Sequence, residues 1–195
     1  MNLPHFYLAS KSPRRRQILD MVGMKFTLLD IEVDEDNHFA DNPEEYVMSL
    51  SAKKAQEAST RISAGIIAAA DTIVYLDGKI LNKPLDAEDA RRMLAALSGR
   101  THTVYTGFTL LEVPGGRSVR QCEATKVTFR KLETEEIEEY IESGAPFDKA
   151  GAYGIQDDLS ALFVERIDGD FYNVVGLPLP KFYLALRSFS EAGSQ

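Results

Sequence analysis

Two long extended segments joined by a short turn constrain the fold of this chain more than any other feature. They cover residues 102–113 and 118–130, with Pro114-Gly115-Gly116 between them. Such a turn between extended segments predicts an antiparallel hairpin. Elsewhere, apolar segments alternate with amphipathic ones, a pattern typical of α/β proteins. The sequence therefore predicts an α/β fold with a mixed, twisted sheet flanked by helices.

Local patterns place the remaining elements. Apolar runs predict strands over residues 6–9, 66–75 and 162–167. Helical spacing of apolar residues, with capping residues before several of the segments, predicts helices over residues 43–58, 87–97, 133–143 and 178–189. The first of these helices begins at a cap supplied by Asp41 or Asn42.

Composition restricts the class of protein. The 195 residues are 44% hydrophobic, which suits one compact domain, in one or two lobes, with a sizeable core. A net charge of −8 argues against a general nucleic-acid binder, which needs a broad positive field. We expect a cytoplasmic protein without a membrane partner, because no secretion signal or membrane-spanning run is evident. The single cysteine, Cys122, excludes an intramolecular disulfide.

A basic loop follows the first predicted strand. Residues 10–16 contain two serines and four cations, and Ser12 is placed to cap a helix that has Pro13 at its first position. One interpretation is a surface helix whose basic first turn is merely solvated. Cations at a helix N-terminus oppose the helix dipole, however, so this arrangement favours a site for an anion such as phosphate.

Asp71 interrupts the apolar strand predicted over residues 66–75. A carboxylate is costly to bury unless it holds a metal, a transferable proton or a cation, so its position indicates function. In the alternative interpretation the strand ends at Ala70, and Asp71 and Thr72 begin a turn. Lys83, which precedes Pro84, is weak evidence by itself, because lysines are ordinarily exposed.

Taken together and in order along the chain, these motifs resemble a known family. The segments that carry the resemblance are Leu8-Ala9-Ser10-Lys11-Ser12-Pro13-Arg14-Arg15, Ala70-Asp71-Thr72-Ile73-Val74, Lys83-Pro84 and Asp148-Lys149-Ala150-Gly151-Ala152-Tyr153-Gly154-Ile155-Gln156. The sequence resembles the Maf family of nucleoside triphosphate pyrophosphatases, and within it the branch that acts on dTTP and UTP. The resemblance implies one catalytic domain over residues 1–195, elongated and two-lobed with a central cleft, similar to the inosine triphosphatases.

The resemblance also implies roles for individual residues. The triphosphate would be bound by Ser10, Arg14, Arg15, Lys54 and Lys83. Asp71 would accept a proton, and substrate choice would depend on Arg14, Thr72 and Gln156. A divalent cation, Mg²⁺ or Mn²⁺, would be held by Asp71 and Glu35. The carboxylate of Asp71 could serve as a metal ligand, a base or both.

The implied reaction is hydrolysis of dTTP and UTP, with modified pyrimidine nucleotides as further candidates, to the monophosphate and pyrophosphate. Besides the nucleotide, the resemblance suggests a second copy of the chain as partner, since members are often dimeric. The alternative function is a non-catalytic nucleotide-sensing module linked to cell division. A binder has little use for Asp71, which favours an enzyme.

The chain departs from the family pattern at two places. Asp157-Asp158 follows Gln156 where related sequences usually carry glycine, which makes the loop near the base more acidic. Lys53 stands where a glutamate commonly precedes the phosphate-binding lysine, so Lys54 is the residue expected to bind phosphate.

Overall fold

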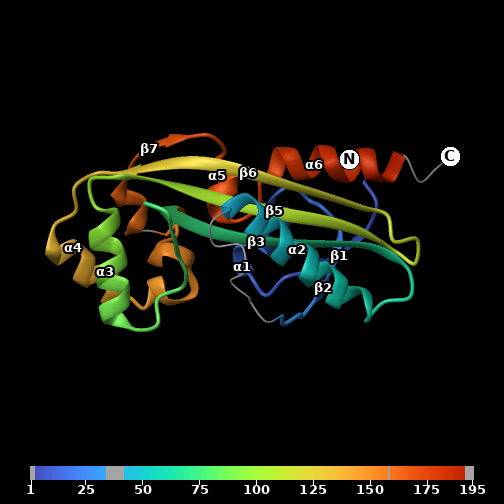
Figure 1. Ribbon diagram of the computed structural model, residues 1–195, viewed down its shortest axis with the longest axis horizontal. Coiled ribbons are helices and arrows are strands. Elements are labelled where there is room, and N and C mark those ends of the chain that lie inside the picture. Colours follow the sequence, from blue (N-terminus) through green and yellow to red (C-terminus); the bar gives the residue numbers. More distant parts are fainter. Residues whose placement is uncertain (1–2, 34–41, 158, 192–195) are drawn as a thin grey trace.

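One mixed sheet runs the length of an elongated molecule (Figure 1). The computed structural model describes residues 3–33, 42–157 and 159–191. The strands of this part of the chain form a seven-stranded sheet. They are β1 (Phe6–Ala9), β2 (Phe26–Leu29), β3 (Gly65–Leu76), β4 (Lys79–Leu81), β5 (Thr101–Val113), β6 (Ser118–Phe129) and β7 (Val164–Asp168).

The helices cover both faces and one end of this sheet (Figure 1). They are α1 (Pro13–Met21), α2 (Pro43–Ser59), α3 (Ala87–Leu97), α4 (Thr134–Glu142), α5 (Phe171–Val175) and α6 (Leu179–Glu191), with the 3₁₀ helices η1 (Ala145–Asp148), η2 (Ala150–Ala152) and η3 (Ser160–Phe163). The expected cap of α2 is Asn42, whose side chain accepts a hydrogen bond from the amide of Glu45. No helix in the described part of the chain is both long enough and apolar enough to cross a membrane.

The order of the strands is β2-β1-β3-β5-β6-β7, and β4 pairs with β3. β1 runs parallel to β2 and β3, whereas the pairs from β3 through β7 are antiparallel. The predicted mixed sheet and its central hairpin are therefore confirmed. The strand expected over residues 162–167 begins later, at Val164, because η3 occupies residues 160–163 and buries Phe163.

Alternate residues of β3 face different cores. Ile67, Ala69 and Ile73 pack beneath α2, whereas Ala68 and Val74 join the larger core that includes α1, α3, α4 and α6. This alternation follows from the period of a strand. Asp71 shares the parity of the α2 face, and Thr72 that of the opposite face. One strand thus presents two polar side chains in two directions.

Strand pairing is interrupted along one edge of β3. β1 pairs with β3 as far as Ala69, and β4 begins to pair at Val74, while β5 occupies the other edge throughout. Residues 70–73 therefore have no strand neighbour on that edge within the described chain. This stretch of β3 is thus left without a strand partner among the described residues on one edge, in the middle of an otherwise continuous sheet.

Gly107 allows α2 to approach the sheet at the level of this interruption. It pairs with Asp71 across β3 and β5, and a Cβ atom at Gly107 would lie 2.6–2.7 Å from backbone atoms of Val47 and Met48. Because backbone atoms cannot move aside as a flexible side chain can, only glycine fits at this contact. The close approach brings α2 within reach of Asp71.

Replacing this glycine should destabilise the fold. We expect Gly107→Ala to lower the free energy of unfolding by about 1–3 kcal/mol, since the added methyl group must push α2 away. Gly115→Ala in the hairpin turn is the matched control, because its Cβ would be 3.4 Å from the flexible Glu112 side chain. Urea denaturation measures both variants, and equal stability of the two would contradict the steric argument.

Candidate functional site

A cavity of about 530 Å³ opens at the interrupted edge of β3. Its walls come from the β1–α1 loop, residues 70–74 of β3, the segment after β4 and residues 148–156. Each predicted site residue in the described chain lines this cavity, namely Ser10, Arg14, Arg15, Lys54, Asp71, Thr72, Lys83 and Gln156. Glu35, the predicted second metal ligand, lies outside the described residues.

Asp71 is a strand residue paired with a lysine. β3 continues to Leu76, so the alternative in which the strand ends at Ala70 is wrong. Lys54, on the inner side of α2, places its Nζ 2.6 Å from Asp71 Oδ1, and the two side chains are 17% and 11% exposed. Lys53 is not among the described residues that line the cavity. The ion pair orients the carboxylate while leaving it at the cavity wall.

The start of α1 presents polar groups to the cavity. Ser12 occupies the N-cap position but makes no side-chain cap hydrogen bond, and its own amide instead donates to Ser10 Oγ at 3.2 Å. The first turn of α1 contains no acidic residue. An N-terminus of this kind, in the wall of a cavity, favours binding of an anion.

Arg15 connects three parts of the cavity floor. The buried guanidinium donates from Nε to the carbonyl of Gly176 at 2.7 Å, from Nη1 to Ser10 Oγ at 3.3 Å, and from Nη2 to Thr72 Oγ1 at 2.9 Å. These contacts fix its position, so it supplies a rigid positive charge rather than a mobile one.

A polar ladder beneath Arg15 was not predicted from the sequence. Thr72 Oγ1 lies 2.9 Å from Thr106 Oγ1, and Thr106 in turn donates to the carbonyl of Asn173 at 3.0 Å. Thr72 and Thr106 face each other in the register of β3 and β5, a relation that the sequence could reveal only once the pairing is known. This ladder satisfies buried hydroxyls, and so it keeps Thr72 in place beside Arg15.

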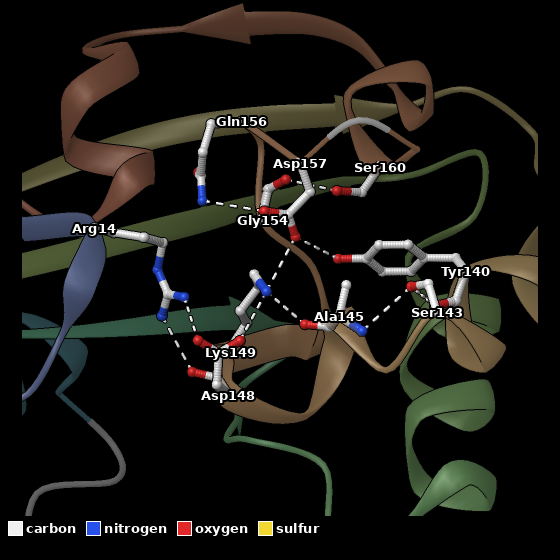
Figure 2. A network of polar contacts seen from close by, with 10 residues as sticks. All are labelled: Arg14, Tyr140, Ser143, Ala145, Asp148, Lys149, Gly154, Gln156, Asp157 and Ser160. Atoms are coloured by element: carbon white, nitrogen blue, oxygen red, sulfur yellow. Dashed lines mark hydrogen bonds and ion pairs between the residues drawn. The ribbon is translucent and has the colours of Figure 1, made fainter. Parts of the chain in front are cut away.

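Arg14 extends across the cavity to the opposite wall. Its Nη1 lies 2.6 Å from Asp148 Oδ2, and its Nη2 donates to the Asp148 carbonyl at 3.1 Å (Figure 2). Burial acts to raise the pKa of Asp148, but hydrogen bonds from Lys149 and Arg14 hold that pKa below its ordinary value. Asp148 was not predicted as a site residue. It connects the first turn of α1 to the segment of residues 148–156.

Tyr153 lines the cavity and forms a buried hydrogen-bonded pair with His102. His102 Nε2 lies 2.7 Å from Tyr153 Oη, and both side chains are buried. Burial lowers the pKa of His102 to about 4 and raises that of Tyr153 above its usual range. Both groups are therefore neutral near pH 7, and His102 is a buried residue of β5.

Positive charge predominates in the cavity although the chain is acidic. Among the described residues, six cationic side chains line the walls against three carboxylates; the cations are Lys11, Arg14, Arg15, Lys54, Lys83 and Lys149, and the acids are Glu32, Asp71 and Asp148. The cavity thus concentrates cations in a protein of net charge −8. Such a field suits a small polyanion.

Comparison with known proteins agrees with this geometry. The sequence model of the family described as Maf-like protein matches residues 5–189. The chain belongs to the Maf family. It is 50% identical over 183 residues to a dTTP/UTP pyrophosphatase of Carboxydothermus hydrogenoformans, covering 94% of this chain and 97% of that relative.

Two further known proteins are similar to this chain. A dTTP/UTP pyrophosphatase of Clostridium perfringens (strain SM101 / Type A) is 48% identical over 184 residues, covering 93% of this Maf protein and 95% of that relative. The solved structure of the Staphylococcus aureus Ham1 protein gives a TM-score of 0.47 at 10% identity, over 64% of this chain and 71% of that one.

Proposed function

We propose that this Maf protein hydrolyses dTTP and UTP to the nucleoside monophosphate and pyrophosphate. The observation that carries the proposal is Asp71, a carboxylate held by Lys54 at an open position of a buried strand, inside a cavity rich in cations. The dTTP/UTP pyrophosphatase names of the relatives at 50% and 48% identity support the same substrates.

The cations that line the cavity fit a triphosphate. Ser10, Arg14 and Arg15 come from the segment that leads into and begins α1, and Lys83 comes from the segment after β4. Hydrolysis builds charge on the transferred phosphoryl group and on the leaving oxygen. Fixed cations such as Arg15 stabilise that charge without first having to reorganise.

Asp71 is the proposed base. A water oxygen attacks the α-phosphorus, Asp71 accepts a proton from this water, and the bond to the β-phosphate oxygen breaks. The electron pair of that bond leaves with pyrophosphate. Lys54 orients the carboxylate, because its Nζ contacts Oδ1 at 2.6 Å and so leaves Oδ2 as the oxygen for the proton.

We propose Mg²⁺ or Mn²⁺ as cofactor. Within the described residues no three His, Cys, Asp or Glu side chains are grouped as a metal site. Asp71 and Glu32 nevertheless provide hard oxygen donors in the cavity, and Mg²⁺ is commonly held by one or two carboxylates together with substrate phosphates. Asp71 would hold the ion, and Glu35 stays a predicted ligand. When bound, such an ion neutralises phosphate charge and makes a water molecule more acidic.

Gln156 is the residue proposed to distinguish bases. It lines the cavity, and its carboxamide carries both a donor and an acceptor for a pyrimidine edge. Arg14 and Thr72 are proposed to influence substrate choice less directly, since Arg14 contacts Asp148 and Thr72 contacts Arg15. A cytoplasmic location, a single catalytic domain and a homodimer stay predictions.

The first experiment is pyrophosphate release from dTTP, UTP, dCTP, CTP, dATP, ATP, dGTP and GTP. We expect release from dTTP and UTP with Mg²⁺ or Mn²⁺, and loss of release after addition of EDTA. Release that persists in EDTA would contradict the metal requirement. Saturable binding of every nucleotide without release would instead support the nucleotide-sensing alternative.

Asp71→Asn should remove turnover and keep nucleotide binding. We expect kcat to fall by about 10²- to 10⁴-fold, since the amide cannot accept the proton, while Kd for dTTP stays the same or falls because one negative charge is removed. Asp77→Asn, the same change at an exposed position in the β3–β4 turn, is the control. Near-normal kcat in Asp71→Asn would exclude the proposed base.

Gln156→Ala should relax base preference more than it slows hydrolysis. We expect the ratio of kcat/KM for UTP to that for CTP to fall by about tenfold, the loss expected when a hydrogen-bonded base edge is no longer recognised. Gln56→Ala on the exposed side of α2 controls for loss of a glutamine. An unchanged ratio would count against base recognition by Gln156.

A further inference from the structure

Asp157 lies directly behind Gln156 and is held by three groups. Its Oδ2 accepts a hydrogen bond from Tyr140 Oη at 2.9 Å and lies 3.1 Å from Lys149 Nζ, and its Oδ1 accepts from Gln156 Nε2 at 3.3 Å (Figure 2). Gln156 and Lys149 line the cavity, whereas Asp157 is not among the lining residues of the described chain. Asp157 therefore acts on the cavity through its neighbours.

Gly154 provides the space for this carboxylate. A Cβ atom at Gly154 would lie 2.8 and 2.9 Å from the two carboxylate oxygens of Asp157, and 2.7 Å from Lys149 Cε. Two hydrogen bonds also hold the chain at this glycine. The amide of Asp157 and the hydroxyl of Ser160 both donate to the Gly154 carbonyl, at 2.8 and 2.5 Å. The position of the carboxylate is thus determined on several sides.

Lys149 and Tyr140 both donate to the Asp157 carboxylate. Lys149 is buried, and its ammonium contacts three acceptors: the Ala145 carbonyl at 2.5 Å, Asp148 Oδ1 at 2.7 Å and Asp157 Oδ2 at 3.1 Å. Burial raises the pKa of Tyr140 above its usual range, so the phenol stays protonated and donates. The Asp157 carboxylate accepts hydrogen bonds from both of these donors.

The Asp157 carboxylate determines the orientation of the Gln156 carboxamide, because a carboxylate can only accept hydrogen bonds. Its amino group must face Asp157, and its oxygen must take the other side. Uracil and thymine have an acceptor at position 4 and a donor at N3, whereas cytosine has a donor at position 4 and an acceptor at N3. For a ring held in one place by its triphosphate, these two orders require opposite orientations of the carboxamide.

We propose that Asp157 is a positioning residue for base selection, which fixes the Gln156 carboxamide in the orientation that matches uracil and thymine. The inference rests on the proposed function, in which Gln156 contacts the base. Asp157 makes no contact with the nucleotide in this scheme. It excludes cytosine by preventing the carboxamide from turning over, which is a form of discrimination against the wrong ligand.

Asp157→Asn tests the inference. The oxygen of the new amide is retained by Tyr140 and Lys149, which are donors, so its amino group faces Gln156 and the Gln156 carboxamide must turn over. We expect kcat/KM for CTP relative to UTP, and for dCTP relative to dTTP, to rise by about 10- to 100-fold, the range expected when an unpaired polar edge becomes paired. Asp77→Asn again controls for the charge change and should leave both ratios unchanged.

Two further variants test whether Asp157 acts on base preference through Gln156. Asp157→Gly introduces the residue that related sequences usually carry, and it removes the carboxylate without reversing the carboxamide. The CTP/UTP and dCTP/dTTP ratios should therefore rise, but less than in Asp157→Asn; this variant also replaces Asp157→Asn if that variant fails to fold. In a Gln156→Ala background, Asp157→Asn should leave the base ratios unchanged, since it acts through Gln156. Each ratio is measured on one preparation, so a merely structural defect lowers both activities together.

The results separate the inference from the proposed function. If Gln156→Ala relaxes base preference and Asp157→Asn and Asp157→Gly keep the wild-type ratios, positioning by Asp157 is wrong and base recognition by Gln156 stands. An equal loss of activity on all nucleotides in the Asp157 variants would likewise overturn it. If Gln156→Ala itself leaves the ratios unchanged, base recognition fails, and the inference fails with it.

Discussion

Along one edge of β3, strand pairing stops at Ala69 and resumes at Val74, and the rest of the site depends on this interruption. A paired strand would have covered this edge of Asp71 and Thr72. The strand alternation turns these neighbours toward different faces, so that Lys54 of α2 meets Asp71 and Arg15 of α1 meets Thr72. A short unpaired stretch thus brings helices from both sides of the sheet to one cavity.

The close approach of α2 to the sheet also depends on the backbone, at Gly107. Gly107 pairs with Asp71 and allows the backbone at Val47 to come within 2.7 Å of where a Cβ would be. Lys54 lies two turns further along α2, and it reaches Asp71 because the helix is held against β5. An ion pair near the protein interior is favourable only with good geometry, and here the packing of the helix supplies that geometry.

Features of the site that depend on neighbouring residues could be predicted from the sequence, whereas contacts between residues far apart in the chain could not. Asp71 in a buried strand and the basic loop before α1 are local features, and both were predicted. Ser12 was expected to cap α1 with its side chain, but Ser10 Oγ takes the amide of Ser12 instead. The contact of Arg14 with Asp148 joins residues 134 positions apart, and periodicity carries no information about such a pair.

The buried Lys149 also connects the two proposed functions of the site, phosphate binding and base recognition. Arg14, Asp148, Lys149 and Asp157 form a row of alternating charges, from the first turn of α1 to the neighbour of Gln156. Burying the Lys149 ammonium would be costly alone, but three acceptors satisfy its three donors, so the row holds together as a unit. Lys149 would have to break one of these contacts to bind phosphate. Its position in the cavity wall therefore serves to fix Asp148 and Asp157, and through them the side chains proposed to contact the phosphates and the base.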